Sequence, residues 1–129
     1  MAFEWNASTL RDKYGEPLAG ETFQVRPGLI MIVDYGPDRR VCRMWASQSA
    51  SHQRLVEIID ELLPLAERGK EIGRGLKIIG GYSMRWTLYE HVMLFESYES
   101  NKLDRCIGFT INFRHPDCDS PDPNQYHEA

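Results

Sequence analysis

SHQRLVEIIDELLPLAER, residues 51–68, is the segment of the chain with the clearest helical periodicity. Its apolar residues recur at intervals of three and four positions, which places them on one face of a helix. They are Leu55, Ile58, Ile59, Leu62 and Ala66. Acidic residues occupy the opposite side, and strand-like segments precede and follow. A helix with one broad apolar face between strands is expected to pack across a β-sheet.

Pro64 lies inside this helical pattern. Proline has no backbone N–H and its ring clashes with the preceding turn, so the regular helix is expected to kink or end near Leu63. Ser49 or Ser51 is expected to cap the N-terminus of the helix.

A short helix is expected near the start of the chain, over residues 8–14. Asn6 or Ser8 can cap it, because their side chains accept hydrogen bonds from the first free N–H groups. Gly15 and Pro17 follow it and are typical of a helix end.

Three strands are expected between the two helices, over residues 21–26, 29–35 and 41–46. The second and third form a hairpin around a turn at Gly36, Pro37 and Asp38. With a loop over 36–39, the expected pairs are Tyr35 with Arg40, Val33 with Cys42, and Met31 with Met44.

The segment after the central helix begins with residues 69–81, which contain five glycines and are expected to be a loop with room for a short strand over 76–79. Residues 85–97 then alternate as one strand, with His91 on its inward face. Residues 105–115 alternate more clearly and must be buried on one face under the central helix. The buried set is Ile107, Phe109, Ile111 and Phe113.

These elements predict an α+β fold. A mostly antiparallel sheet of about five strands is expected, covered by one long helix (51–68) and one short N-terminal helix. The two parts of the chain, each a helix followed by strands, resemble each other in element order only. Residues 1–115 are expected to form a single domain, and residues 116–129, rich in proline and aspartate, an extended or disordered tail.

The opening segment LRDKYGEP, residues 10–17, is followed by a hairpin. It resembles the helix-turn-strand units of small bacterial domains of the beta-lactamase-inhibitor and outer-membrane-assembly lipoprotein type, over about thirty residues. The resemblance implies an α+β fold and carries no functional residue to this chain.

Composition narrows the function classes. The chain has 129 residues and a net charge of −4, which argues against a nucleic-acid partner. Its longest apolar run, residues 29–33, is too short to span a membrane. The N-terminus lacks the features of a signal peptide. A mature secreted or periplasmic protein, from which the signal peptide has been removed, would lack them too.

Three cysteines, Cys42, Cys106 and Cys118, do not fit a disulfide framework, although one bond among them is compatible with the sequence. Cys42 and Cys106 lie in strand-like segments, where cysteine is commonly a small buried residue. The odd count favours a cytoplasmic location over a secreted or periplasmic one.

Positive charge gathers in the glycine-rich segment and directly after it, at Lys70, Arg74, Lys77 and Arg85. Glycines expose backbone N–H groups and nearby cations add charge, so the segment is a candidate anion site. It follows a helix, whereas a phosphate-binding loop precedes one, and it lacks that motif. The alternative is a solvated loop whose cations balance an acidic surface.

His91 is the candidate general base, and the alternative is a buried neutral histidine. No cofactor or metal site is expected, because the acidic, histidine and cysteine residues after 114 match no zinc spacing. Trp45, Tyr82, Trp86 and Tyr89 are candidates either for a ligand pocket or for core packing.

Two hypotheses follow for function. The first is a non-enzymatic domain that binds a protein partner or a small-molecule ligand, with a homodimer compatible with the sequence. The second is an enzyme acting on a small anionic substrate, with His91 as base and Arg74 or Arg85 as anion-binding groups. An enzyme needs His91 in a concavity beside a cation, and a binding domain needs an exposed apolar face or strand edge.

Overall fold

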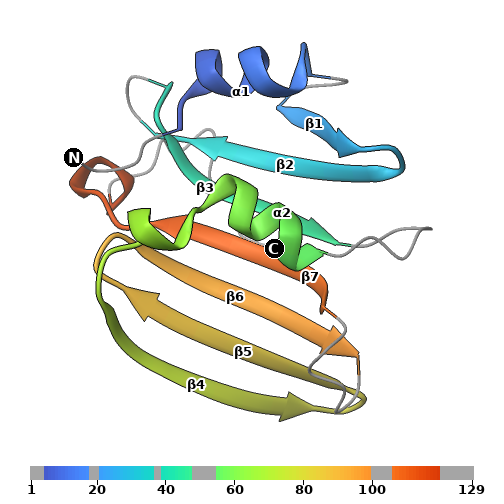
Figure 1. Cartoon of the computed structure of the whole chain (residues 1–129), viewed down its shortest axis with the longest axis vertical. Coiled ribbons are helices and arrows are strands. Elements are labelled where there is room, and N and C mark those ends of the chain that lie inside the picture. The colour runs from blue at the N-terminus through green and yellow to red at the C-terminus, as the bar shows by residue number, and fades with distance from the viewer. Residues whose placement is uncertain (1–4, 18–20, 37–38, 48–54, 100–105, 120–129) are drawn as a thin grey trace.

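The computed structural model describes residues 5–17, 21–36, 39–47, 55–99 and 106–119. These residues form one antiparallel sheet of seven strands, in the order β1-β2-β3-β7-β6-β5-β4, with both α-helices on one face (Figure 1). The elements are α1 (Ala7–Tyr14), β1 (Thr22–Arg26), β2 (Leu29–Tyr35), β3 (Val41–Ser47), α2 (Leu55–Leu62), η2 (Leu65–Glu67), β4 (Glu71–Ile79), β5 (Tyr82–Tyr89), β6 (Val92–Glu99), β7 (Cys106–Phe113) and η3 (Pro116–Asp119). The α+β class with an antiparallel sheet is confirmed. The expectation of about five strands is wrong. Residues 69–81, expected to be mostly loop, contain the strand β4, and residues 85–97, expected to be one strand, are divided between β5 and β6.

Asn6 begins α1 as the sequence predicts. Its Oδ1 accepts a hydrogen bond from the N–H of Thr9 at 2.9 Å, and Thr9 Oγ1 accepts one from the N–H of Asn6 at 2.9 Å. The two bonds form a capping box. Gly15, with φ of 81°, ends the helix.

β2 and β3 form the expected hairpin with a different register. The observed pairs include Met31 with Ala46, Val33 with Met44 and Tyr35 with Val41. A bulge between Asp34 and Tyr35 changes the register along the hairpin. Over most of its length the pairing differs from prediction by two residues, so the same side chains still face the core.

The central helix is shorter than predicted. Of the expected range 51–68, α2 covers residues 55–62, and 51–54 lie outside the described residues. Pro64 ends the regular helix as expected, and the 3-10 turn η2 follows. Ala66 is exposed there instead of continuing the apolar face, while Arg68 is buried.

α2 packs on β7 through the apolar face that the sequence predicts. Its buried residues are Leu55, Ile58, Ile59 and Leu62. Of the expected buried set of β7, Phe109 and Ile111 are buried, whereas Ile107 and Phe113 are only half-buried. Trp5 Nε1 donates to the free carbonyl of Leu62 at 2.7 Å, which satisfies a backbone acceptor at the end of the helix.

The glycine-rich segment is a strand, not a loop. β4 pairs with β5 along its length, and Gly80–Gly81 forms the two-residue turn between them. Gly75 pairs with Trp86, whose indole lies so close that a Cβ at Gly75 would be 2.5 Å from it. The aromatic ring covers the glycine backbone and thereby compensates for the missing side chain.

The predicted single strand over 85–97 is also wrong, because the chain turns at Glu90 and His91 and forms the β5–β6 hairpin. The turn reverses the alternation, so Tyr89 and Val92 are both buried on the same face. Neither turn residue is glycine or proline, and the sequence gives no local signal for the reversal.

The sheet consists of two halves that meet at the centre. β1-β2-β3 and β5-β6-β7 are both antiparallel meanders, and their last strands, β3 and β7, pair with each other. α1 precedes the first meander. α2 precedes the second, with β4 inserted before β5. The resemblance of the two halves is therefore topological, with an additional edge strand in the second.

The end of the described chain is covalently attached to β3. Cys118, in η3, forms a disulfide with Cys42, with Cα atoms 5.3 Å apart. The expected domain boundary at residue 115 stays a prediction, although Cys118 lies beyond it. Residues 120–129 of the expected tail lie outside the described part of the chain.

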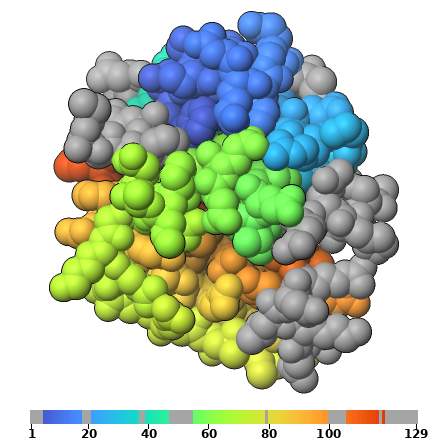
Figure 2. Space-filling model, in the orientation of Figure 1, coloured from blue at the N-terminus to red at the C-terminus, as the bar shows by residue number. Residues whose placement is uncertain are grey.

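The sheet thus has two different faces. The covered face carries α1 and α2, which Figure 2 shows side by side in blue and green. Glu61 of α2 connects them: it accepts hydrogen bonds from Tyr14 Oη at 2.6 Å and from Arg26 Nη2 of β1 at 2.8 Å. The opposite face, called the open face below, carries no helix among the described residues.

Candidate functional site

His91 lies exposed on the β5–β6 turn and not on the inward face of a strand. Its backbone N–H donates to the carbonyl of Arg68 at 3.2 Å, and its carbonyl accepts from the N–H of Arg114 at 2.9 Å. Its imidazole Cδ2 would be 2.8 Å from a Cβ at Gly69, a residue with φ of 80°. The backbone of His91 therefore connects the end of η2 to the end of β7.

The four predicted anion-binding residues do not converge. Strand alternation places Arg74 and Arg85 on the covered face, diagonally opposite each other on β4 and β5. Lys77 lies on the open face, because it is three residues after Arg74 in the same strand. Lys70 precedes β4.

The charges of the two arginines are already matched by carboxylates. Arg74 makes two hydrogen bonds to Glu71, each of 2.8 Å, and Arg85 Nε donates to Glu96 at 3.1 Å. A guanidinium bound to a carboxylate in this way offers less charge to a second anion. Anion binding by these residues stays a prediction, and the observed ion pairs weigh against it.

Glu96 is the centre of a buried polar cluster on the covered face that the sequence did not reveal. It is 6% exposed and accepts hydrogen bonds from Arg85 Nε at 3.1 Å and from Tyr98 Oη at 3.0 Å. Burial, together with the neighbouring Glu96, raises the pKa of Tyr98. Burial also raises the pKa of the nearby Cys106 thiol to about 11. Both groups are therefore neutral at pH 7, which suits a structural cluster better than a nucleophilic one.

The open face carries one row of mostly apolar side chains that crosses the sheet. Successive strand pairs bring its members into line: Ile32 with Trp45, Trp45 with Thr110, Thr110 with Phe95, and Phe95 with Trp86. All five are exposed or half-buried, and Ile32 is 39% exposed. We call this set, Ile32, Trp45, Thr110, Phe95 and Trp86, the aromatic row.

Neighbouring groups hold the two tryptophans of the row. The guanidinium of Arg43 lies 4.3 Å from the centroid of the Trp45 ring, and Arg43 Nη2 is bound to Asp34 at 2.6 Å. Trp86 packs over Gly75 of β4. Rings that are fixed before binding lose little conformational entropy when a partner arrives.

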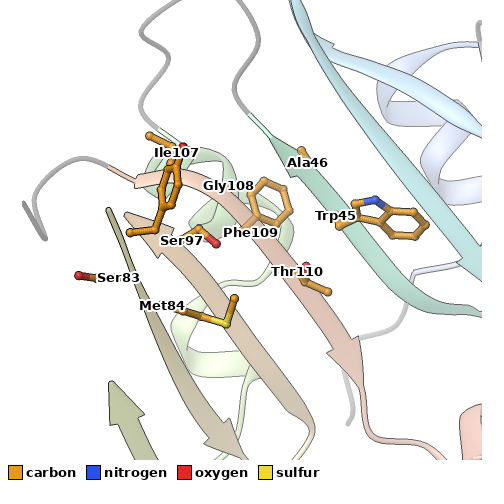
Figure 3. A pocket seen from close by; sticks show the side chains of 10 residues that line it. Trp45, Ala46, Ser83, Met84, Ser97, Ile107, Gly108, Phe109 and Thr110 are labelled. Atoms are coloured by element: carbon orange, nitrogen blue, oxygen red, sulfur yellow. The ribbon is translucent and has the colours of Figure 1, made fainter. Parts of the chain in front are cut away.

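A hollow of about 480 Å³ adjoins the aromatic row. Ser97 pairs with Gly108 on the open face, and these small residues leave space between Met84 on one side and Thr110 on the other (Figure 3). The full lining is Trp45, Ala46, Tyr82, Ser83, Met84, Ser97, Ile107, Gly108, Phe109 and Thr110. The lining is mainly apolar and contains serine and threonine hydroxyl groups but no charged side chain.

This arrangement can bury an apolar group and hydrogen-bond to a small number of polar atoms. Beside the hydroxyl groups of Ser83, Ser97 and Thr110, its lining contains no carboxylate, imidazole or thiol. The hollow is therefore suited to binding an apolar group.

The aromatic candidates of the sequence divide between the two faces. Trp45 and Tyr82 line the hollow and Trp86 lies in the aromatic row, whereas Tyr89 is buried on the covered face beside Arg68. Ile32, Phe95 and Thr110 were not predicted as site residues. The period-two alternation assigns each of them to a face, but only the register between strands brings them together.

No protein-family model, curated protein or solved structure matches the chain. The resemblance of residues 10–17 to small bacterial domains therefore stays an expectation. Among the described residues, no three histidine, cysteine, aspartate or glutamate side chains gather as a metal site would require. Within the same residues, no helix is long and apolar enough to cross a membrane.

Proposed function

We propose that this chain is a small non-enzymatic interaction domain that binds a protein partner through the open face of its sheet. The aromatic row is the observation that carries the proposal. Specific interfaces commonly have a centre of tryptophan and other aromatic residues, fixed before binding and surrounded by polar residues. Asp34, Arg43 and Asn112 lie beside the row on this face.

The shape of the hollow favours a protein over a small molecule. Sites for small ligands enclose most of the ligand surface. Here Ser97 and Gly108 lie at the bottom of the hollow, which opens outward from the sheet. Such a shape can accept one apolar side chain of a partner whose remaining surface lies along the aromatic row.

The alternative, an enzyme with His91 as base and Arg74 or Arg85 as anion-binding groups, has weaker support. His91 is exposed, but the two arginines are each bound to a carboxylate. The aromatic row needs no free charge, since Ile32 is exposed and its aromatic members are half-buried on the open face.

The disulfide is relevant to the cellular compartment of the domain. Disulfides persist in oxidising compartments and are rare in the cytosol. The cytoplasmic location expected from the cysteine count stays a prediction. The Cys42–Cys118 bond supports the secreted or periplasmic alternative, and we include that location in the proposal.

Site-specific photo-crosslinking in the source cells tests the proposal. A photoreactive residue replaces Ile32 or Met84, which are 39% and 36% exposed on the open face, and Asp12 serves as an exposed control on α1. The same partner should be captured from both open-face positions and not from Asp12. Capture should be lost when Trp45→Ala is added.

Three results would overturn the proposal. One is the absence of a discrete adduct at either open-face position. Another is an adduct that forms equally from Asp12. The third is an adduct that Trp45→Ala leaves unchanged, because a partner seated on the aromatic row must contact that ring.

A further inference from the structure

The two edges of the sheet are protected to different degrees. β1 is five residues long, has a bulge between Gln24 and Arg26, and is followed by Pro27. Short strands, bulges and nearby proline all hinder pairing with a foreign strand. β4 is nine residues long and contains no proline, and its bulge lies at its start, between Glu71 and Gly73, so the residues from Gly73 to Ile79 form a regular edge. Its outer side is therefore the more available template for strand addition.

β4 exposes an unusual amount of apolar surface. Ile72, Leu76 and Ile78 are 57%, 52% and 62% exposed. They are three of the eight large hydrophobic side chains that are exposed among the described residues, and Tyr82 and Met84 of the adjoining β5 are two more. A long apolar edge strand of this kind is a site of pairing with another chain.

The turn between β4 and β5 determines which backbone groups point outward. A two-residue hairpin loop is closed by a hydrogen-bonded pair, here Ile79 and Tyr82. Hydrogen-bonded pairs alternate along an antiparallel ladder. The N–H and C=O groups of Lys77 therefore point toward β5, and those of Arg74, Leu76 and Ile78 point toward the free edge.

We propose that β4 pairs antiparallel with β4 of a second copy of this chain, about a twofold axis at Gly75, and joins the two sheets into one. In this register Arg74 lies opposite the partner's Leu76, and Ile72, which lies at the bulge of β4, comes next to the partner's Ile78. Each of these two contacts, of which the one between isoleucines is apolar, occurs twice by symmetry. The edge of β4 is thus self-complementary, as an interface between two copies related by a twofold axis must be.

Charge selects this register over its neighbour. Moving the axis by one residue to Arg74 keeps the faces matched but sets the two Arg74–Glu71 pairs against each other with like charges opposite, which is less favourable than arginine opposite leucine. With the axis at Gly75, Lys77 lies opposite the partner's Gly73 on the open face. The indole of Trp86 covers Gly75 and lies 3.9 Å from a Cβ at Gly73, so the ammonium can approach the partner's Trp86 ring.

The test compares wild type with Leu76→Lys and Ile78→Lys, separately and combined. Leu65→Lys is the matched control, because Leu65 is 69% exposed but lies in η2, away from the edge. Light scattering after size exclusion gives the mass. Wild type and the control should have twice the mass of the chain, and the combined β4 variant the mass of one chain, with unchanged circular dichroism.

Amide hydrogen exchange tests the register independently of mass. The outward amides of Arg74, Leu76 and Ile78 should be protected in wild type and lose protection on dilution, whereas Lys77 stays protected in every variant. A monomeric wild type at its highest soluble concentration would overturn the proposal, as would a dimer that survives the combined β4 variant. Unprotected outward amides in a dimer would overturn it too, because strand pairing requires those bonds. These outcomes do not depend on the partner of the open face.

Discussion

At the scale of the residue, Glu61 couples the packing of the two helices to charge. Its carboxylate accepts hydrogen bonds from Arg26 and Tyr14, and Lys13 Nζ lies 3.7 Å away. The hydrogen bond from Arg26 is the main cause that lowers the pKa of Glu61 from 4.5 to about 2. One residue thereby joins α1, β1 and α2 on the covered face.

The stability that Glu61 contributes should depend on pH. Its pKa is lower in the folded than in the unfolded protein, so the contribution is complete above about pH 4.5 and is lost as the pH falls toward 2. The loss should be at most about 3 kcal/mol in the free energy of unfolding. Urea titrations between pH 6 and 2 measure it.

Two substitutions separate Glu61 from the other carboxylates. Glu61→Gln should be less stable at pH 6 and should show a shallower decline with acid than wild type. Asp12→Asn, on the exposed side of α1, should follow the wild-type curve. Equal acid slopes for wild type and Glu61→Gln would contradict this account of the network.

At the scale of the element, the sequence predicts the parts that depend on local periodicity. α1, with its Asn6 cap, the apolar face of α2 and its end at Pro64 all follow from nearby residues. The β2–β3 hairpin and the buried residues Phe109 and Ile111 of β7 are also confirmed. In each case one short segment contains the whole signal.

β4 shows why the remaining elements could not be predicted in the same way. Its glycines are typical of loops, and their strand conformation depends on Trp86, which lies beyond a turn and covers Gly75. At the β5–β6 turn the residues suggest a continuous strand where the chain in fact reverses, since Glu90 and His91 are not typical turn residues. The aromatic row depends in addition on four strand registers, none of which the sequence specifies locally.

The contact between Trp86 and Gly75 can be tested by mutation. Gly75→Ala should destabilise the protein by about 1–3 kcal/mol, because the new Cβ would lie 2.5 Å from the indole. Gly81→Ala is the control, since nothing lies within 4 Å of its added Cβ. In the background of Trp86→Ala, the cost of Gly75→Ala should be much smaller. Additive effects of the two substitutions in urea unfolding would contradict the contact.

At the scale of the whole molecule, a helix-covered face supports an open one. The covered face contains the apolar core and its two polar clusters, at Glu61 and at Glu96. The Cys42–Cys118 bond attaches the end of the described chain to β3, whose Trp45 belongs to the aromatic row. β3, which carries Trp45 of the proposed interface, is thus also the strand that the disulfide attaches to the end of the described chain.

Reducing this disulfide should lower the stability of the domain. The bond joins residues 76 positions apart, and closing so long a loop restricts the unfolded chain. We expect a loss of about 2–4 kcal/mol in the free energy of unfolding on adding a thiol reductant. Cys118→Ser should show the same loss and no further response to reductant. An unchanged wild-type midpoint after complete reduction would contradict this prediction.

The affinity of Trp45→Ala for the partner captured at Ile32 and Met84 is the most direct test of whether the open face binds that partner, because Trp45 belongs both to the aromatic row and to the hollow. Calorimetry with the purified partner gives Kd for wild type, Trp45→Ala and the control Leu65→Ala. Trp45→Ala should weaken binding by at least about 2 kcal/mol, roughly 30-fold, while Leu65→Ala leaves Kd unchanged. Equal Kd values for wild type and a folded Trp45→Ala would contradict the assignment of the open face as the binding surface.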